Sequence, residues 1–185
     1  MGFWNDRSKP EAKRQFRWLF SVGGFDPWVC KKVTKPSFTM TETKHNYLNH
    51  SFYYPGRIEW QTIDVTIVDP AAPDSAMTVM SMISSAGYQI PKDDTRQKTM
   101  SKKLGADVLG EPLIKQIDSD GDALETWTLH NAWIKDVKFG ELSYEDDAMT
   151  EITLTLRYDY AKLVTTNPGN GNGVNGDKLT SFGTS

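Results

Sequence analysis

Residues 118–122, Asp-Ser-Asp-Gly-Asp, form the stretch of this chain that most resembles a metal-binding loop. Alternating carboxylates are typical of the calcium loop of an EF-hand, which has glycine as its sixth residue and a bidentate acid as its twelfth. Here glycine is the fourth residue and the twelfth is Leu129. Asp-Gly is also typical of the tight turn between two strands. The sequence therefore favours a hairpin tip over a calcium site.

Three histidines, His45, His50 and His130, are the other candidates for metal binding or base catalysis. None has a cysteine or an acidic residue at a recognised ligand spacing. The chain also has no nucleophile elbow, no phosphate-binding glycine loop and no zinc-protease motif. We therefore predict no catalytic residue, no metal site and no cofactor, and we expect surface or interface histidines.

Aromatic and methionine side chains could instead bind a ligand or a partner. The strand positions of Trp18, Trp60 and Trp127 favour burial in a core or an interface over stacking on sugars or bases. A methionine cluster could form an adaptable binding surface, but its helical spacing favours the core; its members are Met77, Met80 and Met82.

Composition limits the class of protein. The chain has 185 residues, 38% of them hydrophobic and 24% charged, which is typical of a soluble globular domain. A formal net charge of -3 argues against a dedicated nucleic-acid binder. The one cysteine, Cys30, cannot form an internal disulfide, and no apolar run approaches the roughly 20 residues of a spanning helix. We expect a soluble protein assembled in the cytoplasm, with no membrane insertion.

The first half of the chain predicts several strands and one helix. Residues 15–22 and 28–33 are expected to form a hairpin around Gly-Gly-Phe-Asp-Pro, and a further strand covers 37–43. Residues 44–57 lack periodicity and predict a long loop. The strand that follows, 57–68, shifts its apolar phase after Trp60, which indicates a bulge or burial of both faces.

The helix is expected over residues 74–88. Its apolar residues recur at helical spacing, Asp74 is a plausible N-cap, and Gly87 ends the pattern. The polar stretch 92–110 is ambiguous, with a short helical turn near Lys102 as one interpretation.

Three more strands are expected in the second half, at 113–117, at 124–139 with a break near Asn131, and from Met149 onward. The predicted fold is mainly β: an antiparallel β-sandwich or barrel with one flanking α-helix and a long inter-strand loop. We expect one domain at 15–164, an N-terminal arm at 1–14, and a flexible extension rich in Gly and Asn at 165–185.

The last strand alternates with unusual regularity. Its apolar set is Ile152, Leu154, Leu156, Tyr158 and Tyr160, and its polar set is Glu151, Thr153, Thr155, Arg157 and Asp159. The apolar face requires a core. The alternation by itself does not show what the polar face meets, and an ordinary solvated surface is consistent with it.

Two stretches resemble the tail tube protein of contractile-tailed bacteriophages. They are YYPGRIEWQTIDVTIVDP, which precedes the expected helix, and WTLHNAWIKDVKFGELSYEDDAMTEITLTLRYDYA near the end. The order of expected elements fits this family from about Gln15 to Lys162.

This resemblance implies a structural role without enzymatic activity. The family is similar in fold to the haemolysin-coregulated tube protein of type VI secretion, a small β-barrel with a flanking helix. Six copies form a ring, and stacked rings form a hollow tube inside a contractile sheath. The implied partners are further copies of the chain, the sheath protein, the tape-measure protein, baseplate and terminator proteins, and viral DNA that passes without adhering; the implied location is the virion tail.

The resemblance also suggests two sets of functional residues. The polar set of the last strand is expected to face the lumen, and an aromatic set in the loop is expected to contact the adjacent ring: Tyr47, Phe52, Tyr53, Tyr54 and Arg57. The alternatives are a tube-initiating baseplate protein, a secretion-system tube protein or, in another class, a monomeric carbohydrate-binding domain that uses the same aromatics.

Overall fold

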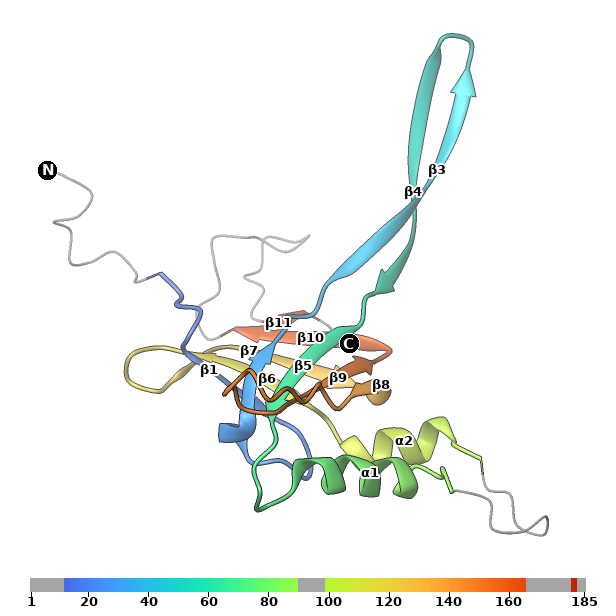
Figure 1. Ribbon diagram of the computed structural model, residues 1–185. Helices are drawn as coiled ribbons and strands as arrows, with labels where there is room; N and C mark the ends of the chain where they lie inside the picture. Colours follow the sequence, from blue (N-terminus) through green and yellow to red (C-terminus); the bar gives the residue numbers. More distant parts are fainter. Residues whose placement is uncertain (1–11, 90–98, 166–180, 183–185) are drawn as a thin grey trace, which may run out of the picture.

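A computed structural model of the chain describes residues 12–89, 99–165 and 181–182 (Figure 1). These residues form two β-sheets, one long hairpin and two short α-helices. The strands are β1 (Trp18–Ser21), β2 (Cys30–Val33), β3 (Phe38–Tyr47), β4 (His50–Trp60), β5 (Ile63–Val68), β6 (Leu113–Ile117), β7 (Ala123–His130), β8 (Trp133–Lys138), β9 (Glu151–Arg157), β10 (Tyr160–Thr165) and β11 (Ser181–Phe182). The helices are α1 (Ser75–Ser85), α2 (Lys102–Leu109) and the 3-10 turn η2 (Pro27–Val29).

The two sheets share one hydrophobic core. One has the order β1-β6-β7-β10-β11 and the other β2-β5-β9-β8, and every pairing is antiparallel. Side chains from both sheets and both helices meet in the core, including Ile114, Leu129, Val65, Leu154, Val79 and Leu109. The predicted fold class, mainly β and antiparallel, is confirmed as a sandwich-like arrangement, and no closed barrel forms in the described part of the chain.

The helix predicted at 74–88 is confirmed as α1. The Asp74 side chain accepts a hydrogen bond from the Met77 amide at 2.8 Å, as an N-cap does. At the other end Gly87 has a φ of 113°, and the Tyr88 amide donates to the Ile83 carbonyl. Met82 is buried, whereas Met77 and Met80 are exposed, so the prediction of a methionine core is right only for Met82. A second helix, α2, occupies the region near Lys102 and is capped by Ser101.

The hairpin predicted between residues 15–22 and 28–33 is wrong. β1 pairs with β6 in one sheet, and β2 pairs with β5 in the other. Only an isolated bridge between Val22 and Phe25 remains of the turn. The Gly-Gly-Phe-Asp-Pro segment therefore carries the chain from one sheet to the other, where each strand pairs with a partner that is distant in sequence.

The loop predicted at 44–57 is also wrong, because this stretch forms most of the β3–β4 hairpin (Figure 1). No core covers either face of this two-stranded ribbon, so apolar side chains occur on both faces and Tyr53 interrupts the alternation along β4. The apolar phase shift after Trp60 is neither a bulge nor two-sided burial: β4 ends at Trp60 and β5 begins at Ile63 in another sheet.

The second half follows the prediction closely, with β6, β7, β8 and β9 at the expected places and Asn131 at positive φ in the break. The last strand is shorter than expected, however. β9 ends at Arg157, and β10 begins at Tyr160 in the other sheet. Tyr158 still points into the core, but Tyr160 is exposed, so it does not share the apolar face.

The terminal segments predicted as an arm and a flexible extension fall mostly outside the described residues. The exception is β11, which pairs with β10 through Leu163–Phe182 and Val164–Ser181. No described helix is long and apolar enough to cross a membrane.

Candidate assembly surfaces

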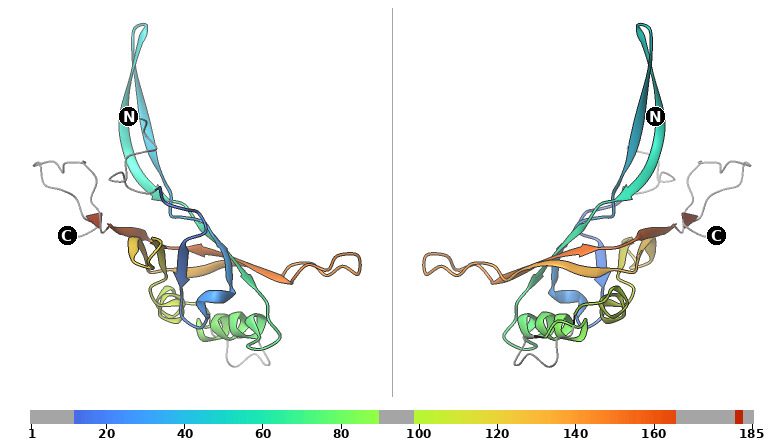
Figure 2. Two further views of the ribbon diagram at one scale, coloured as in Figure 1. Left: turned by 90° about the vertical axis from the view of Figure 1, so that its left-hand side faces the viewer. Right: turned by 90° about the vertical axis from the view of Figure 1, so that its right-hand side faces the viewer.

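The β3–β4 hairpin projects far beyond the sandwich (Figures 1 and 2). Its base is fixed by aromatic contacts: Phe38 lies edge-on to Trp60 at 5.2 Å between ring centroids, and Trp60 lies 5.9 Å from the core residue Tyr158. A bulge interrupts the pairing between Met40 and Glu42. Gly56 lies opposite it, where a Cβ would come within 2.9 Å of the Thr41 carbonyl oxygen. These contacts fix the base of the hairpin against the core.

The two faces of the hairpin differ near its tip. Directly opposed residues of an antiparallel pair share a face, and the pairs Tyr47–His50, His45–Phe52 and Thr43–Tyr54 alternate with Asn46–Ser51 and Lys44–Tyr53. One face is therefore mostly aromatic, and the other is mostly polar. We call the first the aromatic face; its members are Thr43, His45, Tyr47, His50, Phe52 and Tyr54.

The predicted ring-contact residues do not all lie together. Tyr47, Phe52 and Tyr54 lie on the aromatic face, and each side chain is about half exposed or more. Tyr53 lies on the opposite face, where the Lys44 ammonium is 5.9 Å from its ring. Arg57 is beside the bulge, and its amide donates to the Thr41 hydroxyl. The sequence did not predict this division between the two faces, because only the pairing of β3 with β4 shows which residues share a face.

The polar set of β9 lies on the outer face of the four-stranded sheet, opposite the core. The Thr155 hydroxyl donates to Asp64 of β5 at 2.7 Å, and Lys31 of β2 forms an ion pair with Glu151. Register places further charged residues on this face. Its acids are Asp64, Asp136 and Glu151, and its bases are Lys32, Lys138, Arg157 and, through its ion pair with Glu151, Lys31, so charges of both signs are mixed on this face.

Asp159 is separate from this face. It lies at the corner between β9 and β10, where its carboxylate accepts from the Lys102 ammonium at 2.6 Å and from the Asn131 amide at 2.9 Å. These hydrogen bonds hold the pKa of Asp159 below its ordinary value. Asp159 therefore joins α2 to the β7–β8 turn, a structural contact that the alternation of the sequence did not reveal.

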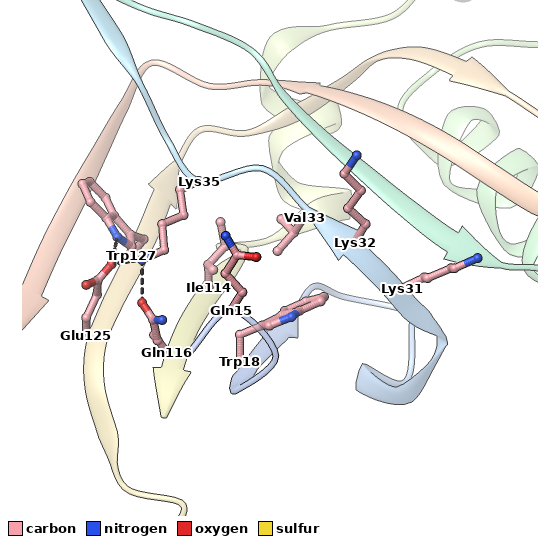
Figure 3. Close-up of a pocket in the computed structure, with 10 residues that line it drawn as sticks. All are labelled: Gln15, Trp18, Lys31, Lys32, Val33, Lys35, Ile114, Gln116, Glu125 and Trp127. Atoms are coloured by element: carbon pink, nitrogen blue, oxygen red, sulfur yellow. Dashed lines mark hydrogen bonds and ion pairs between the residues drawn. The ribbon is translucent and has the colours of Figure 1, made fainter. Parts of the chain in front are cut away.

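A cavity of about 630 Å³ opens between the edge strands β1 and β2 (Figure 3). Its walls include Trp18, Val33, Ile114 and Trp127, and lysines lie along its rim. Glu125 is buried at one end, where Lys35 lies 2.6 Å from its carboxylate, the Trp127 indole donates at 2.7 Å, and Lys13 forms a second ion pair.

The titration of Glu125 reflects this cluster. Burial raises the pKa of its carboxyl group, but hydrogen bonds from Lys13, Lys35 and Trp127 outweigh that effect and lower the pKa to about 2. Sequence inspection gave no sign of this cluster, because its members come from distant segments.

The features that suggested chemistry are structural here. Asp118 accepts from the amides of Asp120 and Asp122 at 2.9 Å each, which is the turn predicted for residues 118–122. His130 stacks on Tyr160 and lies 3.2 Å from Glu111, and His50 lies edge-on to Phe52. Among the described residues, no group of three or more His, Cys, Asp or Glu could hold a metal ion.

No protein-family model and no curated protein matches this sequence. Solved structures do match. The tube-terminating cap of the anti-feeding prophage matches with a TM-score of 0.64 and 12% identity, over 89% of this chain and 98% of that one. The chain has the fold of a contractile-injection tube protein.

Two further structures share this fold. The sheath/tube terminator of the PVC extracellular contractile injection system matches with a TM-score of 0.61 and 15% identity, over 83% of this chain and 97% of that one. A chain of the PVC sheath–tube complex matches with a TM-score of 0.58 and 16% identity, over 84% and 93% respectively. At these identities the likeness concerns the fold.

Proposed function

We propose that this chain is the repeating structural subunit of a phage tail tube, without enzymatic activity. It would form stacked, hexameric rings around a DNA-conducting channel inside a contractile sheath. The observation that carries this proposal is a tube-protein fold over most of the chain, combined with a long exposed hairpin. The sheath, tape-measure, baseplate and terminator proteins are the partners that this role requires.

Contact between rings is assigned to the aromatic face of the hairpin. Large aromatic side chains exposed together on one face are costly in water and are typical of protein interfaces. Phe52 and Tyr54 lie two residues apart on β4 and so point the same way, and both are exposed. A neighbouring ring would bury them.

The channel wall is assigned to the outer face of the β2-β5-β9-β8 sheet. Glu151, Thr153, Thr155 and Arg157 lie on this face, where acidic residues lie among the basic ones. Acids among the bases suit the passage of DNA, because each lysine or arginine contact with phosphate adds adhesion and a neighbouring carboxylate opposes it. Asp159 is left out of this wall because it is engaged at the β9–β10 corner.

A subunit at the end of a tube is the second candidate, because two of the matched chains come from structures of a tube cap and of a sheath/tube terminator. A repeating subunit polymerises into tubes of many rings, whereas an end subunit stops at a single ring. A carbohydrate-binding domain that used the exposed aromatics would stay monomeric.

Negative-stain electron microscopy of the purified full-length chain tests the proposal. We expect hollow tubes of stacked rings over a range of concentrations, with or without a tube initiator. Single rings under all conditions would favour the end subunit. A protein that remains monomeric in analytical ultracentrifugation, even with initiator present, would contradict both assignments.

A further inference from the structure

The segment between β8 and β9, residues 139–150, projects from the sandwich as a loop (Figure 2). We call it the acidic loop. It contains Glu141, Glu145, Asp146 and Asp147 and no lysine, arginine or histidine. The structure gives these four acids no ion pair with any described residue. The acidic loop therefore carries four uncompensated negative charges.

Two large apolar side chains accompany these charges. Leu142 is 89% exposed, and Tyr144 is completely exposed. Scattered apolar residues are common on surfaces, but an unsupported loop that holds both Leu142 and Tyr144 in water loses the free energy of their burial. The loop therefore presents two exposed apolar side chains surrounded by negative charges.

The cavity between β1 and β2 has the complementary composition. Its walls offer the apolar surfaces of Trp18, Val33, Ile114 and Trp127. Four lysines lie at or beside its rim, and two of their charges are met by Glu125 and Glu151, so 4 − 2 leaves two positive charges. These lysines are Lys13, Lys31, Lys32 and Lys35. Figure 3 shows Lys31, Lys32 and Lys35 spread around the apolar side chains.

The two surfaces belong to opposite edges of one sheet. The cavity is bounded by β2, the first strand of the β2-β5-β9-β8 sheet, and the acidic loop follows β8, the last. A contact between opposite edges is heterologous: each copy offers its loop to one neighbour and its cavity to another, which is the kind of contact that builds a ring when the rotation between copies closes.

The other projecting element, the hairpin, is a poorer occupant of this cavity. Along β3 and β4 its charged residues are Glu42, Lys44, Arg57 and Glu59, which cancel. It offers no net charge to the lysine rim, whereas the acidic loop offers four negative charges.

We propose that the acidic loop of one copy inserts Leu142 and Tyr144 into the β1–β2 cavity of the next copy in the ring. The loop carboxylates then lie against the lysine rim, and Trp18 and Trp127 pack against the inserted side chains. This proposal rests on the proposed tube function and identifies the contact by which neighbouring subunits recognise each other.

Cysteine crosslinking tests the contact directly. Two chains that both carry Cys30→Ala are made, one with Tyr144→Cys and the other with the exposed cavity residue Gln15→Cys, and each bears a different tag. The mixture is assembled, oxidised and separated under denaturing conditions. We expect a disulfide-linked heterodimer, while a mixture of Asp107→Cys and Gln15→Cys chains, in which the exposed Asp107 lies on α2, stays uncrosslinked.

Charge exchange provides the second readout. Replacement of Glu145 and Asp147 by lysine should raise the protein concentration required for assembly about tenfold or more, which corresponds to the loss of a few charged contacts. Lys32→Glu, at a rim residue without an ion pair among those described, should impair assembly likewise. A mixture of the two variants should recover part of the loss. The control with the same charge change is Asp107→Lys with Glu111→Lys, at exposed residues on α2 and directly after it.

The outcomes separate this contact from the tube function. Normal tubes from the unsubstituted protein, with neither crosslink nor charge effect, would overturn the docking of the acidic loop and leave the tube function intact. An unsubstituted protein that forms no ring or tube would overturn the tube function, and the docking with it.

Discussion

Glu125 is the buried carboxylate on which one end of the cavity depends. It accepts hydrogen bonds from Lys35 and from the indole of Trp127, forms an ion pair with Lys13, and has a pKa of about 2. Its removal leaves these donors without their shared acceptor. Because both lysines are half exposed, water replaces part of the hydrogen bonding that they lose.

We predict that Glu125→Gln lowers the free energy of unfolding by about 1–2 kcal/mol at pH 7. The folded-state pKa lies below the ordinary value of 4.5, so the unfolded chain takes up a proton first as the pH falls. The contribution of Glu125 is therefore complete above pH about 5 and is lost as the pH falls to about 2. Urea unfolding of both proteins across this range checks the prediction; a constant difference between them would contradict it.

Tyr158 presents the opposite case, a buried polar group whose hydroxyl has no hydrogen-bond partner among the described residues. Its side chain is 2% exposed, and its hydroxyl lies towards the Ser37 backbone without the geometry of a hydrogen bond. Burial raises the pKa of the phenol. The ring supports Trp60 at the hairpin base, so the ring rather than the hydroxyl matters for packing.

We predict that Tyr158→Phe leaves the free energy of unfolding unchanged or raises it by up to about 1 kcal/mol, because an unsatisfied hydroxyl is removed. Tyr158→Ala should lower it by about 3 kcal/mol or more through loss of the ring. Thermal and urea unfolding of the two variants separates the contributions. A clear loss of stability in Tyr158→Phe would show that the hydroxyl has a stabilising partner.

At the scale of elements, the two ends of the hairpin differ: its base contributes to the folded core, and its distal half is available for assembly. Its base is anchored by Phe38, Trp60 and Tyr158, whereas its distal half contacts nothing in the sandwich. Changes near the tip should therefore leave the core intact and act on contacts between copies.

We predict that Phe52→Ser with Tyr54→Ser gives a folded subunit that polymerises poorly. Aromatic anchors can contribute about 2 kcal/mol or more each to an interface. The matched control is Tyr53→Ser, since Tyr53 and Tyr54 are exposed to the same extent, 59% and 58%, on opposite faces. Sedimentation of polymer and electron microscopy give the readout. Equal effects of Tyr53→Ser and Tyr54→Ser would show that the aromatic face has no special role.

At the scale of the whole molecule, the proposed tube makes the outer face of the β2-β5-β9-β8 sheet a channel wall. Thr153 lies on the central strand β9, between Thr66 on one side and Lys138 on the other, and its hydroxyl forms no hydrogen bond among the described residues. A substitution there changes the charge of the wall without breaking a contact. Every ring would repeat the change.

We predict that particles with Thr153→Lys eject DNA more slowly, and that the difference grows at low ionic strength, because phosphate contacts are screened by salt. Thr153→Glu is the control of similar size and opposite charge and should leave the rate unchanged. Ejection kinetics at two ionic strengths, with a reconstruction of each mutant tail, provide the measurement. Equal rates in both variants would place this face away from DNA.

The sequence by itself determined the elements whose patterns are local. The helix at α1 followed from Asp74, Gly87 and apolar residues at helical spacing, and β9 followed from strict alternation between Ile152 and Leu156. Asn131 marked the break between β7 and β8, and the 118–122 turn followed from Asp-Gly. Each of these elements is defined by interactions within a single segment of the chain. The sequence therefore predicted these elements and, with them, the mainly β class of the fold.

Only the tertiary structure decided which strands pair and which surfaces they form. β1 and β2 are separated by eight residues, yet they belong to different sheets because their partners, β6 and β5, lie elsewhere in the chain. The hairpin lacks the clean apolar–polar pattern of a half-buried strand because no core covers either face. Its aromatic face, the Glu125 cluster and the β1–β2 cavity arise from register and from long-range packing, which spacing along one segment does not encode.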